Sequence, residues 1–224
     1  MTEQYAEQGA EGVRGRGERL IMSTSDESPR SFAPSDVRHR LANVFQLLST
    51  LTRMRIQRTQ DAEARRLLSW TLDAVGALGA VQQRMLDPAG GDFSVFLADM
   101  LPVWRRRCAG RPVRMELVAD PLPLREPVAS ALAIIVNELV SNALSHAHPD
   151  GRAGAVRVAL ETLPGGRAAL SVVDDGVGCP TLGGEDRSKL GLWLVRGLTD
   201  QVKGVMTITS ADGVNARLEF PAGL

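Results

Sequence analysis

The chain has 224 residues, 44% of them hydrophobic, which is enough for one or two globular domains with apolar cores. Lys and Arg total 26, as do Asp and Glu, and this balance argues against nucleic-acid binding, which favours a basic excess. The two cysteines, Cys108 and Cys179, are too few for a disulfide framework or a metal knuckle. We find neither a signal-peptide pattern nor a run of about 20 apolar residues, and therefore expect a cytoplasmic protein without membrane insertion.

The N-terminal region is expected to form a flexible arm over residues 1–34, because it has no apolar period and is rich in Gly, Glu, Ser and Arg. Ordered structure is predicted to begin at Ser35 or Asp36, since either side chain can cap the first N–H groups of a helix. An arm of this length is too short to fold into a domain of its own.

A helical hairpin is predicted over residues 35–88. Apolar residues recur every three or four positions in two stripes, with a break at residues 59–61. The first stripe comprises Val37, Leu41, Val44, Leu48 and Leu51, and the second comprises Leu68, Leu72, Val75, Leu78 and Val81. Because a lone hairpin leaves apolar surface exposed, we expect a homodimer in which two hairpins form a four-helix bundle.

A different pattern follows the glycines at positions 90 and 91 and predicts a second domain over residues 92–224. Helices are predicted over residues 93–107, 126–147 and 192–201, and strands over 113–119, 156–160, 168–173, 206–209 and 216–220. Runs of helix and paired strands, rather than strict alternation, indicate a two-layer α+β sandwich. The predicted fold is therefore α+β, with a dimerising helical hairpin before the sandwich.

The long helix predicted over residues 126–147 has a polar pair within an apolar segment. Glu138 and Asn142 are four residues apart, so they lie on one helix face, one turn from each other. Burying an amide without a partner costs about 2–7 kcal/mol, and a ligand or a metal ion is one way to offset such a cost. The alternative is that this edge faces water, as the polar faces of amphipathic helices usually do.

Two glycine-bearing segments follow farther along the chain. Asp174 ends an apolar strand, and its carboxylate can accept a hydrogen bond from an amino group of a ligand. Gly176 and Gly178 in the next turn would let the backbone approach such a ligand closely. A plain turn also favours these residue types. The segment Lys189-Leu190-Gly191-Leu192 opens a helix, whose free N–H groups suit phosphate. The polar residues 179–188 are a candidate lid over a nucleotide.

The order of these motifs resembles that in the ATP-binding domain of histidine kinases. The matching segments are Asn137-Glu138-Leu139-Val140-Ser141-Asn142-Ala143, Asp174-Asp175-Gly176-Val177-Gly178 and Gly191-Leu192. The hairpin agrees with this, because Asp36–Gln46 is similar to the phosphoacceptor segment of a kinase subgroup with a His-Arg-x-x-Asn signature. The resemblance covers residues 35–221.

The resemblance implies an ATP-dependent protein histidine kinase with ATP and Mg²⁺ as cofactors. Because residues 1–34 are too short to fold a sensor domain, its input signal is expected from a separate sensor protein, from the arm itself or from a small ligand. It makes His39 the phosphoacceptor and Glu138 the residue that orients or deprotonates it, and the phosphoryl group then passes to an aspartate of a response-regulator receiver domain. The nucleotide-binding residues that it implies are Asn142 as the Mg²⁺ ligand, Asp174 at the adenine amino group, Gly176 and Gly178 in the adjoining turn, and Lys189, Gly191 and Leu192 near the phosphates.

Two departures from the family pattern keep other functions open. Lys189 stands where related kinases usually have a glycine, and Ser145 stands where a Lys or Arg often assists phosphate binding. The alternatives are a histidine phosphotransfer protein with a degenerate ATP-binding domain, and a serine kinase or binding module of the anti-sigma-factor type. His146 and His148 are predicted to be helix-end residues, where a cationic side chain suits the helix dipole.

Overall fold

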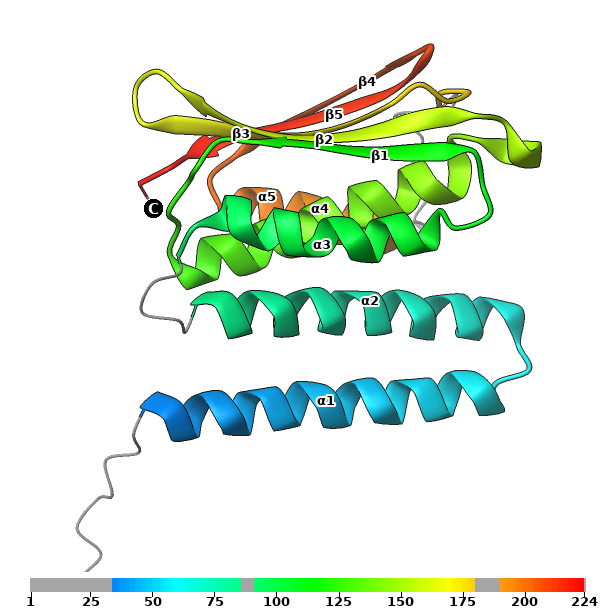
Figure 1. The fold of residues 1–224 in the computed structure, drawn as a ribbon, viewed down its shortest axis with the longest axis vertical. Helices are drawn as coiled ribbons and strands as arrows, with labels where there is room; N and C mark the ends of the chain where they lie inside the picture. Colours follow the sequence, from blue (N-terminus) through cyan, green and yellow to red (C-terminus); the bar gives the residue numbers. More distant parts are fainter. Residues whose placement is uncertain (1–33, 86–90, 180–189, 224) are drawn as a thin grey trace, which may run out of the picture. The chain divides into compact units, whose positions relative to one another are not determined.

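The computed structural model describes residues 34–85, 91–179 and 190–223, and begins with two long helices that form a hairpin (Figure 1). α1 (Pro34–Arg58) and α2 (Ala62–Met85) are joined by a short turn at the break that the sequence predicted. Asp61 Oδ1 accepts a hydrogen bond from Ala64 N over 2.6 Å, and so caps the start of α2. Farther along, a Cβ built on Gly79 of α2 would lie 3.5 Å from the Cβ of Phe45 in α1, which fixes the register of the pair.

The rest of the described chain forms a five-stranded sheet with helices. The helices are α3 (Phe93–Arg107), α4 (Glu126–His146) and α5 (Leu190–Gln201), with a short 3-10 helix, η1 (Pro149–Gly151). The strands are β1 (Val113–Ala119), β2 (Gly154–Leu163), β3 (Arg167–Asp174), β4 (Val205–Ala211) and β5 (Gly213–Pro221). Apart from η1, each matches a predicted helix or strand to within a few residues.

The sheet has the strand order β1-β2-β3-β5-β4. β1 and β2 are parallel because α4 provides the crossover between them, whereas the other neighbours are antiparallel. Helices α3, α4 and α5 all lie along one face of this sheet (Figure 1). The predicted two-layer α+β sandwich is therefore confirmed.

The main core lies between the sheet and its helices. Its largest fully buried side chains include Trp104, Phe93, Phe96, Phe220, Leu132 and Ile135. Val81 of α2 is also fully buried in this cluster, so α2 packs on the sandwich. Each such side chain contributes about 1.5–3 kcal/mol through removal of apolar surface from water.

α4 is the most thoroughly enclosed helix of this fold. It contacts α2, α3, α5, β2 and β3. Among the described residues it is the one helix long and apolar enough to cross a membrane by length and composition, but 72% of that segment is buried inside the structure. Its apolar composition is thus accounted for by its place in the core, and one polar edge carries Glu138 and Asn142.

Candidate nucleotide-binding site

The polar edge of α4 combines a buried carboxyl group with a more accessible amide. Glu138 is only 3% exposed, and its Oε1 is buried without a hydrogen-bond partner among the described residues. Asn142, one turn further along, is half-buried. An unpaired buried acceptor is costly and so is uncommon in a finished core. This edge therefore has the character of a binding site, with unsatisfied polar atoms available to a ligand.

The start of α5 comes very close to this edge. A Cβ built on Gly191 would overlap Glu138 Oε2 and would lie 3.7 Å from the indole nitrogen of Trp70 in α2. The backbone at Gly191 can therefore reach the carboxylate only because this residue has no side chain. The structure thus brings together Glu138 and Gly191, two of the residues that the sequence analysis selected from separate motifs.

Burial controls the electrostatics around Glu138. Desolvation raises the pKa of the Glu138 carboxyl group, and the carboxylate of Asp73 raises it further. The indole of Trp70 and the guanidinium of Arg107 oppose this shift, although the Trp70 N–H is not at hydrogen-bonding geometry with any described residue. Burial also raises the pKa of Asp73, whose Oδ2 lies 3.4 Å from Arg107 Nη1. The site therefore has two neighbouring carboxyl groups whose pKa values are both raised by burial.

A basic cavity of about 420 Å³ adjoins this edge, between α2, α3 and α4. Its charged lining residues are Arg65, Arg66, Arg107 and Asp73. Arg107 also donates a hydrogen bond to Ser141 Oγ over 2.9 Å, which draws its guanidinium across α4. Three arginines against one acidic residue favour an anion such as a phosphate group. The guanidinium of Arg107 therefore lines the same cavity as Ser145, the position at which related kinases often have a Lys or Arg.

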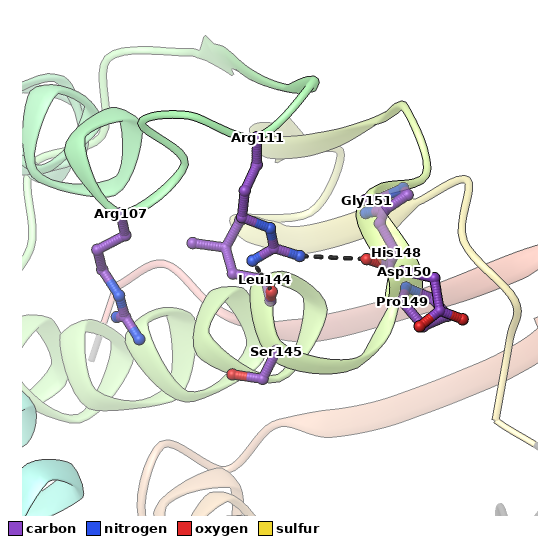
Figure 2. Close-up of a pocket in the computed structure, with 8 residues that line it drawn as sticks. All are labelled: Arg107, Arg111, Leu144, Ser145, His148, Pro149, Asp150 and Gly151. Carbon is purple, nitrogen blue, oxygen red and sulfur yellow. Dashed lines mark hydrogen bonds between the residues drawn. The ribbon is translucent and has the colours of Figure 1, made fainter.

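A second cavity, of about 430 Å³, lies at the C-terminal end of α4 and shares Arg107 and Ser145 with the first. Figure 2 shows Arg111 between the backbone of Leu144 and that of His148. Its guanidinium donates hydrogen bonds to the two carbonyl oxygens over 2.6 and 3.3 Å. Leu144 O belongs to the last turn of α4, whose carbonyl groups the helix end leaves unpaired, and His148 lies just past that end, so Arg111 ties the two together and caps α4.

The turn after β3 is held by Asp174. Its Oδ1 accepts hydrogen bonds from Gly176 N over 3.0 Å and from Val214 N over 3.2 Å, and the residue is 7% exposed. A Cβ on Gly176 would overlap the carbonyl oxygen of Ala147, and Gly178 has a φ of +73°. These glycines therefore allow the turn to approach α4 and the β4–β5 hairpin, in addition to any approach to a ligand that the sequence suggested.

One contact at this turn was not foreseen from the sequence. His148 lies just past the end of α4, as predicted, but its side chain is fully buried, and Nε2 is 2.7 Å from Asp175 Oδ1. The hydrogen bonds from Ala155 N and His148 lower the pKa of Asp175. Asp175 follows Asp174 directly, and Gly154 leaves space for the pair, but neither signal identifies a histidine partner 27 residues away.

The remaining predicted site residues lie elsewhere. Leu192 is half-buried in the first turn of α5, and Lys189 is outside the described residues. His39 lies in α1, and only its backbone is described. Because Phe45 of α1 lies opposite Gly79 of α2, His39 lies opposite about residue 85 of α2. Glu138, in contrast, lies beside Trp70 of α2. At 1.5 Å per residue, that separation is roughly 22 Å along the helix.

Comparisons with known proteins show what this chain is similar to. Residues 110–218 match the family described as a histidine kinase-like ATPase domain. The sensor histidine kinase PdtaS of Mycobacterium tuberculosis is 30% identical over 200 residues, which cover 84% of this chain and 39% of that protein. The chain thus spans less than half the length of this relative.

A solved structure shares the fold. The histidine kinase domain of the blue-light-activated kinase EL346 from Erythrobacter litoralis aligns with a TM-score of 0.64 at 19% identity, over 84% of this chain and 95% of that one. A second structure of that kinase aligns with a TM-score of 0.68 at 19% identity, over 88% of this chain and 62% of that one. These alignments show a shared fold, while the family match over residues 110–218 and the similarity to PdtaS confirm the resemblance to histidine kinases.

Proposed function

We propose that this chain, whose residues 110–218 match the histidine kinase-like ATPase domain, is an ATP-dependent protein histidine kinase. In this proposal His39 is phosphorylated and then passes the phosphoryl group to an aspartate of a response-regulator receiver domain. The observation that carries the proposal is the polar edge of α4, where Glu138 meets the glycine at the start of α5 and Asn142 lies one turn further along. Residues 35–88 would form the dimerisation and phosphotransfer hairpin, and residues 92–224 the catalytic domain.

The described residues fit Mg²⁺ and ATP. Oxygen ligands suit Mg²⁺, and Asn142 supplies an amide oxygen on the accessible part of the α4 edge. The unpaired Oε1 of Glu138 and the side-chain-free backbone at Gly191 leave room for polar contacts next to it. When bound, Mg²⁺–ATP supplies the transferable phosphoryl group. Asp174 would hold the adenine amino group, and Arg107 would add positive charge near the phosphates.

The raised pKa of Glu138 suits a role in proton transfer. A carboxyl group whose pKa lies closer to neutrality is a better general base than an ordinary glutamate, because its conjugate acid forms more readily. In the proposed reaction Glu138 would orient the His39 imidazole or accept its proton. The separation of Glu138 from the level of His39 along the hairpin means that the two must approach each other before transfer.

Homodimerisation is supported by the apolar surface of α1. Five of its apolar side chains are between 44 and 60% exposed, namely Val44, Leu47, Leu48, Leu51 and Met54. A helix face of this kind is costly to leave in water, and a second copy of the hairpin would bury it in a four-helix bundle. We therefore propose a homodimer that receives its input from a sensor protein and docks a receiver domain.

The test is incubation with γ-labelled ATP and Mg²⁺. Label should appear on the wild type, should be acid-labile as phosphohistidine is, and should be absent from His39→Ala and Asn142→Ala. An unlabelled wild type that still accepts phosphate from a phosphorylated receiver would instead establish a phosphotransfer protein. Acid-stable label would establish a serine kinase.

A further inference from the structure

The buried His148–Asp175 pair links the end of α4 to the turn that follows Asp174. Asp175 Oδ1 lies 2.7 Å from His148 Nε2 and 2.8 Å from Ala155 N. A carboxylate can only accept, so the histidine must carry its proton on Nε2 and donate it. Nδ1 is buried without a partner among the described residues. The imidazole is therefore held in one tautomer by a single strong hydrogen bond to a charged acceptor.

The pair packs directly against the backbone of Gly154, where no side chain would fit. A Cβ built on Gly154, the first residue of β2, would overlap His148 Nε2 and would also crowd Asp175 Oδ1. The pair is thus packed over the start of β2 rather than lying loose on the surface. On the other side, Arg111 donates a hydrogen bond to the carbonyl oxygen of His148, which fixes the backbone that bears the ring (Figure 2).

A backbone hydrogen bond links the same two segments as the His148–Asp175 pair. Val177 N donates a hydrogen bond to the carbonyl oxygen of Ala147 over 2.9 Å. The turn is therefore anchored to consecutive residues at the end of α4, once through the backbone of Ala147 and once through the side chain of His148. Asp174 lies between the turn and the β4–β5 hairpin, where its Oδ1 is already occupied by Gly176 N and Val214 N.

We propose that His148 is a positioning residue for recognition of the adenine base, because it holds Asp175 and so keeps Asp174 aimed at the 6-amino group. The inference rests on the proposed function, since it concerns the nucleotide of the same site. His148 touches neither base nor phosphate in this assignment. It acts through the shape of the turn between Asp174 and Gly178, which the hydrogen bond to Asp175 keeps from rotating away from α4.

The test compares two nucleotides that differ at the recognised group. Calorimetric titration with Mg²⁺–ATP and with Mg²⁺–ITP, whose base lacks the 6-amino group, measures how well Asp174 is placed. His148→Leu is expected to weaken ATP binding about tenfold, the effect of losing one well-formed hydrogen bond, and to change ITP binding little. His148→Gln, whose amide N–H can reach Asp175, is expected to restore most of the difference.

A second variant and a second measurement distinguish a loss of positioning from a general loss of the fold. Asp175→Ala removes the acceptor from a side chain that is 60% exposed, so it creates no buried cavity. It should show the same loss of ATP preference, and the double variant with His148→Leu should be no worse than either single change. Hydrogen exchange on the nucleotide-free protein should show faster exchange at Gly176 and Val177 in both variants. Asp150→Asn is the matched control, because Asp150 is exposed and lines the cavity at the end of α4 that His148 also lines.

The outcomes separate the inference from the function on which it rests. Equal loss of ATP and ITP affinity, or unchanged exchange at the turn in Asp175→Ala, would overturn the positioning role while leaving ATP binding intact. If the wild type binds ATP and the variants change its affinity as predicted, but His39 is not labelled, the positioning role stands and the kinase activity is contradicted. A wild type that binds neither nucleotide would remove both.

Discussion

The carboxylate of Glu138 and the backbone of Gly191 are in such close approach that a single methyl group at position 191 would overlap Glu138 Oε2. Two segments separated by about fifty residues of sequence thus meet at the polar edge of α4. The contact joins the helix that bears the proposed general base to the helix that would bind the phosphates, so steric change at one residue must affect the other.

Gly191→Ala is therefore expected to abolish most ATP-dependent autophosphorylation, by at least about tenfold, and to destabilise the fold by about 1–3 kcal/mol as an overpacked site does. Chemical denaturation and the labelling assay measure the two effects. Gly197→Ala, in the same helix but with open space around it, is the control, and should stabilise the protein by roughly 0.5–1 kcal/mol. Equal behaviour of the two variants would contradict the close approach.

Glu138→Gln is expected to raise the stability of the protein at neutral pH by about 1 kcal/mol while removing kinase activity. Burial raises the folded-state pKa of this carboxyl group above the ordinary value for glutamate, 4.5. The protonated Glu138 side chain therefore favours the folded protein at pH values below the pKa that it has in the unfolded chain. This contribution to the free energy of unfolding is lost as the pH rises through its folded-state pKa.

Thermal melts between pH 4 and pH 8 provide the measurement for this variant. The advantage of Glu138→Gln over the wild type should be greatest at the alkaline end and should shrink as the pH falls toward the unfolded pKa. An advantage that grows on acidification would reverse the sign of the proposed shift.

The exposed stripe of α1 offers a direct test of dimerisation. Leu47→Glu combined with Leu51→Glu places two charges on side chains that are 60% and 51% exposed in the single chain. The monomer should tolerate them, but a four-helix bundle should not, because each charge would be buried without a partner. Analytical ultracentrifugation should show a monomer. Val205→Glu, at a 62% exposed position on β4, is the control and should leave the dimer unchanged.

Arg111 is predicted to be irreplaceable by lysine. Its guanidinium bridges the carbonyl oxygens of Leu144 and His148, which a single ammonium group cannot do with the same geometry. Arg111→Lys should cost about 1 kcal/mol and Arg111→Ala about 2 kcal/mol in urea unfolding. Arg114→Lys, an exposed position on β1, should be neutral within error. A neutral Arg111→Lys would show that the cap contributes little.

Local patterns in the sequence were sufficient to predict the helical hairpin, the strands and the fold class. The period of the apolar residues located α1 and α2, and alternation located the strands, since both signals come from neighbours within one element. The polar pair on α4 also stood out because its surroundings are apolar. These are features that a residue's immediate sequence context determines.

The contacts that link distant segments were not predictable in the same way. Nothing near His148 identifies Asp175 as its partner, and nothing near Trp70 indicates that it lies beside Glu138. Gly191 was selected for phosphate binding, whereas the structure adds a steric reason for a glycine there. Such relationships depend on strand order and on how α2 packs on α4, which local periodicity does not encode.

The enclosure of α4 has a mechanical consequence. Besides α2 and α5, α4 packs on α3, β2 and β3 within the sandwich, so the core of the domain holds it in place. Any movement that brings His39 and Glu138 together must then be made by the hairpin and by the beginning of α5, moving around a fixed α4.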